Sequence, residues 1–254
     1  MDFAPDGPAV VLSPHPDDAV LSAWSVLRAP GELTVVNVFA GVPDVGLPRR
    51  ADRLVRATDS RAHVRARLAE DREALALAGR TSLNLDFLDE QHRHADPEAA
   101  ELEAELTEQL PQASALYAPA GIRGDRDHEL VRDIALDLGR RNRVRVVLYA
   151  ELPQAVHYGW PAWVTGDVPD ETLDPEVDWE LALVAAAVDR DSLVPAVAQL
   201  EPAAAAEKLR ALGCYRSRFS LLNRGPLGLL DHPRVLPFEV SWSTDGDRDL
   251  SPVS

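Results

Sequence analysis

The segment that decides the fold is Ala9-Val10-Val11-Leu12-Ser13-Pro14-His15-Pro16-Asp17-Asp18. In it, an apolar run leads into one imidazole and two adjacent carboxylates. The amphipathic residues 19–27 follow, so the order is strand, tight loop, helix. This order places the loop side chains at the carboxyl end of a strand, where open α/β sheets usually bind ligands. His15 and Asp18 are spaced to turn toward one centre, whereas Asp17 faces another way. The segment therefore predicts a pair of metal ligands beside a free carboxylate.

The same alternation of apolar runs and amphipathic stretches continues along the chain to residue 149. Strands are expected at 9–13, 33–39, 83–88, 115–119 and 144–149, and helices at about 18–29, 58–79, 97–110 and 126–140. This pattern predicts an α/β fold, with a Rossmann-like, mainly parallel sheet and helices on both faces. The long loop Gly41–Arg56 is expected at the mouth of a site.

Residues 152–254 break this pattern, and we expect them to form a C-terminal embellishment of a single domain spanning 1–254. Residues 152–175 are rich in proline, glycine and acids, which indicates a surface excursion. Further on, 179–188 and 193–200 are expected to pair as a hairpin, although a helix over 179–188 fits almost as well. The remaining expectations are a helix over 202–215, an edge strand over 237–242 and a loose tail beyond Asp245.

The composition is that of a globular protein, with 46% hydrophobic and 27% charged residues in a chain of 254. No apolar run approaches the length of a membrane span. The first residues lack the basic and apolar regions of a signal peptide, so a cytoplasmic location is expected.

The net charge of −16 argues against nucleic-acid binding. Cys214 is the only cysteine and is expected to be a core thiol. The sequence is also compatible with a homo-oligomer.

A second polar cluster, Gly124-Asp125-Arg126-Asp127-His128-Glu129, also follows a short strand and opens a helix. An Asp-Asp pair before a helix is by itself more typical of a helix cap. Two clusters with histidine and aspartate, however, can meet above one sheet when both follow its strands. Two histidines and one carboxylate are a standard catalytic zinc set, which leaves a coordination position for water.

Other sites are weakly supported. The chain has no glycine pattern for dinucleotides, no phosphate loop and no Gly-x-Ser-x-Gly elbow. Five further histidines are expected to be surface or packing residues: His63, His92, His94, His157 and His232. His157 is a partial exception, because residues 149–160 are suited to form a loop over the site. Trp160 and Trp163 are more typical of local packing than of a substrate pocket.

In its motifs, the chain resembles the PIG-L/LmbE-like family of zinc-dependent de-N-acetylases. His15-Pro16-Asp17-Asp18 matches the first motif of that family, and 125–128 occupies the place of the second, which usually reads His-x-Asp-His. Weaker resemblances follow in the same order along the chain: Arg67–Asp71, Leu88–Arg93, Tyr149–Pro153 and Lys208–Ser217. The resemblance covers most of the chain and implies an LmbE-like fold.

The resemblance implies that His15, Asp18 and His128 hold zinc, with another divalent metal such as Fe²⁺ also compatible. Asp17 would be the general base toward the attacking water and would then donate its proton to the departing amine. Arg67 matches an arginine that helps to bind substrate. The implied reaction removes an acetyl or other acyl group from a small-molecule N-acylated amino sugar or glycoconjugate.

One position departs from the pattern, because Asp125 stands where the family usually has a histidine oriented by the residue equivalent to Asp127. That histidine is implied to stabilise the oxyanion or to protonate the leaving group. An ionised Asp125 cannot donate to an oxyanion, whereas a protonated one can. The sequence therefore leaves three alternatives open: a working deacetylase, a weakened or non-catalytic protein that binds metal or sugar, and an amidase or hydrolase that acts on a different acyl conjugate, such as an antibiotic or a thiol-sugar precursor.

Overall fold

A computed structural model describes residues 5–110, 112–166, 176–186, 188, 193–223 and 232–244 of the chain. These residues form a seven-stranded sheet in the order β3-β2-β1-β4-β5-β7-β6. The strands are β1 (Ala9–Ser13), β2 (Leu33–Asn37), β3 (Ser82–Asn84), β4 (Ala115–Pro119), β5 (Arg145–Tyr149), β6 (Leu193–Gln199) and β7 (Phe238–Thr244). The first five strands are parallel, and β7 runs antiparallel to both β5 and β6. The predicted mainly parallel α/β sheet is confirmed.

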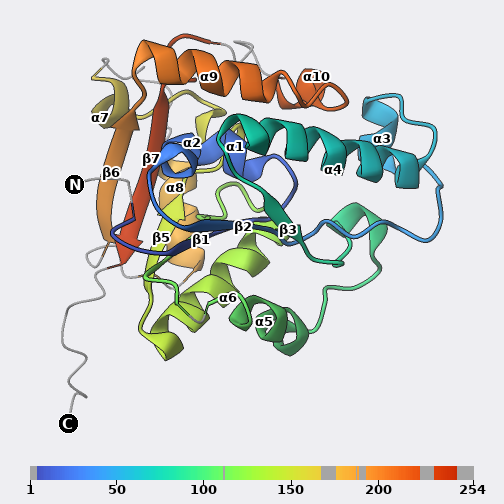
Figure 1. The fold of residues 1–254 in the computed structure, drawn as a ribbon, viewed down its shortest axis with the longest axis horizontal. Helices are drawn as coiled ribbons and strands as arrows, with labels where there is room; N and C mark the ends of the chain where they lie inside the picture. Colours follow the sequence, from blue (N-terminus) through green and yellow to red (C-terminus); the bar gives the residue numbers. More distant parts are fainter. Residues whose placement is uncertain are drawn as a thin grey trace.

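Helices cover both faces of this sheet, as predicted (Figure 1). One face carries α1 (Asp18–Ser22), α2 (Trp24–Arg28), α4 (Ser60–Leu77) and α9 (Pro202–Leu212), and the other carries α5 (Ala99–Thr107) and α6 (Arg126–Asn142). The shorter elements are α3 (Arg50–Leu54), η1 (Glu90–His92), η2 (Gln154–Val156), α7 (Ala162–Thr165), α8 (Glu176–Ala185) and α10 (Phe219–Leu222). None of the helices in the described ranges is both long and apolar enough to cross a membrane.

The centre of the sheet determines where a site can lie. Every residue of β1 and of β4 is buried, as expected for parallel strands covered on both faces. The strand order reverses between these two neighbours, since β2 and β3 continue on one side and β5 on the other. Ligands of open α/β sheets bind in the crevice at such a switch point. The two polar clusters of the sequence directly follow β1 and β4.

The single helix expected over 18–29 is interrupted, which corrects the sequence prediction. Ala23, at φ −136°, separates α1 from α2. The backbone N–H groups of Trp24 and Ser25 then donate to the Glu239 carboxylate of β7, at 2.7 and 2.9 Å. Glu239 also accepts from Lys208 at 2.7 Å, and both side chains are fully buried. The Glu239 carboxylate thus caps α2 from a distant part of the sequence. The local periodicity of residues 18–29 does not indicate this break.

The expected hairpin between 179–188 and 193–200 is wrong. Glu176–Ala185 is helical and forms α8, while β6 pairs antiparallel with β7. β7 also corrects the expected edge strand, because it lies inside the sheet between β5 and β6. The helical alternative agrees with the alanines of α8, and the pairing of β7 depends on contacts that local sequence does not encode. The expected loose tail beyond Asp245 lies outside the described residues.

Asp71 joins three parts of the fold through buried hydrogen bonds. Its carboxylate accepts from Asn37 Nδ2 of β2 at 2.7 Å and from the Tyr215 hydroxyl, which follows α9, at 2.8 Å. The Asp71→Ala variant leaves the Tyr215 hydroxyl buried without this acceptor and removes one partner of Asn37. We therefore expect the free energy of unfolding to fall by about 2–4 kcal/mol.

Urea denaturation of the full chain measures this loss, with Arg72→Ala as the matched control on an exposed neighbouring position of α4. The control is expected to change stability by less than about 0.5 kcal/mol. Equal denaturation midpoints for the two variants would show that Asp71 does not stabilise the fold in this way.

Candidate metal centre and active site

Three potential metal ligands meet at the switch point of the sheet. His15 lies in the loop after β1, Asp18 begins α1, and His128 lies in the first turn of α6, after β4. Their ligand atoms all lie within 4.8 Å of one another. Asp18 Oδ2 is 3.5 Å from His15 Nδ1 and 3.3 Å from His128 Nε2. The structure thus brings together the three residues predicted to hold a metal.

Each imidazole is oriented by a carboxylate on its other ring nitrogen. His15 Nε2 lies 2.8 Å from Asp127 Oδ2, and His128 Nδ1 lies 3.2 Å from Glu151 Oε1. Histidine ligands of metals typically donate their second N–H in this way, which fixes the ring and the nitrogen that faces the metal. Nδ1 of His15 and Nε2 of His128 are therefore the nitrogens that face Asp18.

The loop after β4 is shaped to hold Glu151. The backbone N–H groups of Gly121 and Ile122 donate to Glu151 Oε1 at 2.5 and 3.2 Å. Gly121 has φ +74°, and a Cβ there would lie 2.4 Å from Arg132 Nη1. The positive φ favours glycine at position 121, and a Cβ there would also force the Arg132 guanidinium to shift. The loop in turn fixes the carboxylate that orients His128.

The donor set fits a divalent cation. His128 Nε2 is buried and has no hydrogen-bond partner among the described residues, although it points at a carboxylate. Burial opposes the charged form of His128, but Asp18 and Glu151 raise its pKa well above the usual value. For His15, Asp127 and Asp18 likewise outweigh burial and raise the pKa to about 10. The surrounding carboxylates favour positive charge, and two imidazoles with one carboxylate suit zinc and ferrous iron alike.

A second group, His15, Asp89 and Asp127, also brings its ligand atoms within 4.8 Å of one another. Its carboxylates are already paired with guanidinium groups. Asp127 Oδ1 accepts from Arg93, and Asp89 Oδ2 lies 3.4 Å from Arg67 Nη1. These cations neutralise the charge that a metal would require, so the group with Asp18 is the better metal site.

Asp17 is buried beside the ligand group and faces different partners from Asp18, as expected. Its Oδ1 lies 3.8 Å from Arg67 Nη2, and its Oδ2 lies 3.4 Å from Arg218 Nη1. Burial raises the pKa of Asp17, while the two arginines act in the opposite direction. Oδ2 accepts no hydrogen bond from the described residues. A carboxylate with an open acceptor next to a metal site is suited to receive a proton.

Asp125 and Asp127 have separate partners. Asp125 is the N-cap of α6 and accepts from the Asp127 backbone N–H at 3.1 Å. The Asp127 carboxylate is fully buried and accepts from the Glu90 backbone N–H at 3.0 Å as well as contacting His15. Asp127 therefore orients His15, whereas Asp125 caps α6.

Several residues of the site were not assigned a role from the sequence: Asp89, Arg93, Glu151 and Arg218. Asp89 and Glu151 follow β3 and β5 in the chain, at the sheet edge that carries the site, so their position was a usable signal. Arg218 lies between α9 and α10, where no local pattern marks it.

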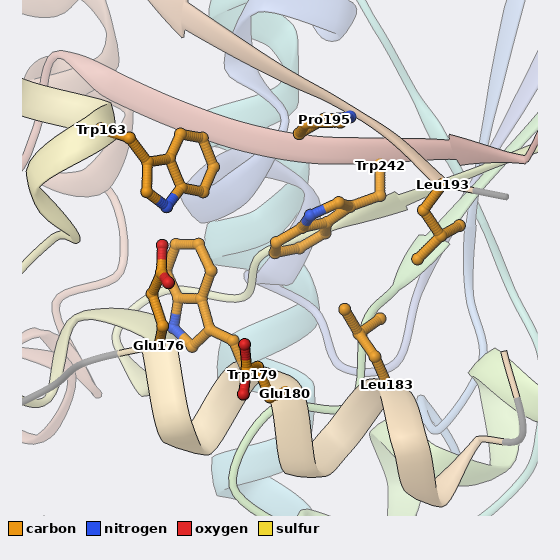
Figure 2. Close-up of a pocket in the computed structure, with 8 residues that line it drawn as sticks. All are labelled: Trp163, Glu176, Trp179, Glu180, Leu183, Leu193, Pro195 and Trp242. Carbon is orange, nitrogen blue, oxygen red and sulfur yellow. The ribbon is translucent and has the colours of Figure 1, made fainter. Parts of the chain in front are cut away.

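The tryptophans that were considered for a substrate pocket pack together elsewhere. Trp160 and Trp163 each contact Trp179 edge to face, at centroid distances of 5.9 and 6.0 Å. Trp163, Trp179 and Trp242 line a hollow of about 410 Å³ between α8 and the β6–β7 strands (Figure 2). None of the candidate metal or catalytic residues is among the residues that line it. The local packing expected for these rings agrees with the structure.

Comparison with known proteins supports the fold. No protein-family profile matches the sequence. No curated protein gives a significant sequence match. Among solved structures, the chain is similar to a deacetylase in the biosynthesis pathway of teicoplanin, with a TM-score of 0.70 and 23% identity over 93% of this chain and 97% of that one. It is also similar to N,N'-diacetylchitobiose deacetylase from Pyrococcus horikoshii, with a TM-score of 0.54 and 14% identity over 97% and 87% of the two chains.

The same fold also occurs with a different reaction. The 4-carboxy-2-hydroxymuconate hydratase GalB from Pseudomonas putida KT2440 is similar over 98% of this chain and 100% of that one, with a TM-score of 0.50 and 15% identity. At these identities the similarities show the fold alone, and the expected LmbE-like α/β fold is confirmed. The activity has to be argued from the site.

The geometry predicts how metal affinity depends on individual side chains. We expect His128→Ala to lose stoichiometric metal, because it removes one of three ligands. Glu151→Gln keeps the ligands but removes the carboxylate that orients His128, so the dissociation constant is expected to rise about 10- to 100-fold. His94→Ala, at an exposed position outside the ligand group, is the control and is expected to bind like the wild type.

Competition with a chromophoric chelator measures these affinities for zinc and for Fe²⁺ in the full-length protein. Circular dichroism of the same samples shows whether each variant is folded. A folded His128→Ala protein with unchanged metal content would contradict the assignment of the site.

Proposed function

We propose that the protein is a metal-dependent hydrolase, with zinc as the metal, that removes an N-acetyl or other N-acyl group from an amino sugar or a glycosylated small molecule. The observation that carries this proposal is the buried Asp17 carboxylate beside the ligand group of His15, Asp18 and His128. A metal ligand set with one base at its side is an arrangement that can hydrolyse an amide. The fold shared with two deacetylases supports the proposal.

The proposed reaction divides the work between the metal and the chain. A zinc ion held by His15, Asp18 and His128 would polarise the acyl carbonyl and lower the pKa of water. Asp17 accepts a proton from the attacking water as the new C–O bond forms. Asp17 then returns this proton to the nitrogen as the C–N bond breaks, which releases a carboxylic acid and a free amine. Asp127 and Glu151 hold the two imidazole rings in place throughout.

A second candidate function is a weakened or non-catalytic protein that binds metal or sugar. Asp125 motivates it, because an ionised carboxylate beside the site repels a developing oxyanion. The structure gives Asp125 another task, since it caps the helix that carries His128 and Asp127. This capping role explains an aspartate at position 125 without a loss of catalysis.

Asp17→Asn separates metal binding from catalysis. The variant keeps all three ligands, so metal content is expected to match the wild type. It loses the group that accepts the proton, so kcat is expected to fall by about 10²- to 10⁴-fold. Release of acetate and of primary amine from a panel of N-acetylated sugars measures this, with the exposed Asp44→Asn as the control.

Release of acetate and amine in a one-to-one ratio by the wild type also distinguishes a hydrolase from a hydratase, which would release neither. An Asp17→Asn protein with wild-type kcat would show that another group is the base.

Substitutions of Asp125 distinguish the two candidate functions. Asp125→Asn retains a side chain that caps helices well and is expected to keep most of the activity. Asp125→His loses this cap, which costs about 1 kcal/mol of stability, and is expected to lower activity. Thermal melting and acetate release are measured on both variants. A large gain in activity for Asp125→His would instead support the weakened-protein alternative.

A further inference from the structure

Arg218 lies at the open side of the candidate base. Its side chain is 20% exposed, and its Nη1 lies 3.4 Å from Asp17 Oδ2. Among the described residues this ion pair is the only polar contact that its guanidinium makes. Burial opposes the charged form of Arg218, but the charges of Asp17 and Asp89 outweigh it and raise the pKa of the guanidinium. The charged guanidinium of Arg218 therefore lies beside Asp17 with N–H groups that make no hydrogen bond to the described residues.

The other arginines of the site are more deeply buried than Arg218. The Arg67 side chain is 4% exposed and lies near both Asp17 Oδ1 and Asp89 Oδ2, while its Nε and Nη2 have no hydrogen-bond partner among the described residues. Arg93 donates to Asp127 and also to Asp96, the latter at 2.8 Å. Arg218 is thus the site arginine that both contacts Asp17 and has a partly exposed side chain, which an incoming molecule can reach.

The backbone around Arg218 is fixed to α4 by buried or half-buried hydrogen bonds. Ser217 donates to the Glu70 carboxylate through its backbone N–H at 3.0 Å and through its hydroxyl at 2.6 Å. Two residues earlier, the Tyr215 hydroxyl donates to Asp71 at 2.8 Å. These bonds hold the segment before Arg218 against the helix that also carries Arg67. The position of Arg218 is therefore set in advance of substrate binding.

We propose that Arg218 is a catalytic residue that donates hydrogen bonds to the oxyanion formed when water adds to the acyl carbon. This inference rests on the proposed function. Because Arg218 contacts Asp17, it lies beside the water that Asp17 deprotonates. It therefore also lies beside the carbonyl group that this water attacks.

In this step the water oxygen bonds to the acyl carbon, Asp17 takes the water proton, and the carbonyl π electrons move to the oxygen that Arg218 stabilises. Collapse of this intermediate restores the carbonyl, breaks the C–N bond and transfers the proton from Asp17 to nitrogen. Arg218 gains and loses no proton. A guanidinium keeps its charge and its planar donor geometry in such a site, which suits it to this role.

The test compares Arg218→Met and Arg218→Lys with Arg216→Met as the matched control. Arg216 lies on the same segment, but its side chain is 62% exposed and pairs with the exposed Glu73. We expect Arg218→Met to lower kcat by about 10²- to 10³-fold, with KM changed much less. Arg218→Lys is expected to retain part of kcat, and Arg216→Met to remain within twofold of the wild type. Zinc content and melting temperature, measured on every variant, show that the site and the fold persist.

Two further readouts separate catalysis from a structural role. Added guanidinium ion is expected to restore part of the kcat of Arg218→Ala. It would not restore kcat if the substitution had only misfolded the segment. Methylphosphonate resembles the tetrahedral oxyanion of an acetyl group, and zinc-loaded Arg218→Met is expected to bind it at least tenfold more weakly than the wild type, with acetate affinity changed less.

The outcomes distinguish this inference from the proposed function. A wild-type protein that releases acetate, together with a folded and zinc-loaded Arg218→Met that retains wild-type kcat, overturns the role of Arg218 and leaves the hydrolase intact. A protein that deacylates no sugar but loses methylphosphonate binding with Arg218→Met overturns the proposed function and supports anion binding by Arg218. Unchanged phosphonate affinity in Arg218→Met also overturns the inference.

Discussion

The site depends on one carboxylate oxygen placed between two imidazoles. Asp18 Oδ2 lies 3.5 Å from His15 Nδ1 and 3.3 Å from His128 Nε2, although His128 is far from the other two in the sequence. This meeting requires β1 and β4 to be adjacent and parallel, so that the loops after both strands end at the same edge. The fully buried strands and the helices on both faces maintain that arrangement. In this arrangement His128 Nε2 is buried and has no hydrogen-bond partner among the described residues.

Charge is distributed around this centre in a consistent order. Asp127 and Glu151 bind the outer nitrogens of the two imidazoles, and Arg93 and backbone N–H groups bind these carboxylates in turn. On the other side, Arg67 and Arg218 flank Asp17 through different oxygens. The ligands are thereby held by carboxylates and the base by guanidinium groups. Asp17 and Asp18 therefore have different partners, even though they are neighbours in the chain.

The sequence predicted the parts of the molecule that local pattern encodes. The strands at 9–13 and 115–119, the loops after them and the helix from residue 126 follow from apolar runs and cap residues, and they deliver His15, Asp18 and His128. Contacts between distant segments were not predictable in this way. Glu239 divides the first helix from a position 215 residues away, and β7 pairs with residues of β5 that lie 92 to 96 positions earlier in the chain. Arg218 was missed for the same reason, since hydrogen bonds to Glu70 and Asp71 of α4, not a local motif, bring its segment to the site.

The central claim is that two imidazoles and one carboxylate of this chain hold a catalytic zinc ion. X-ray absorption at the zinc edge tests it most directly, on full-length protein loaded with one equivalent of zinc. The account predicts low-coordinate zinc with nitrogen and oxygen neighbours at about 2.0–2.2 Å and the outer-shell scattering of two imidazole rings. A spectrum without imidazole scattering, or with that of hydrated zinc, would contradict it.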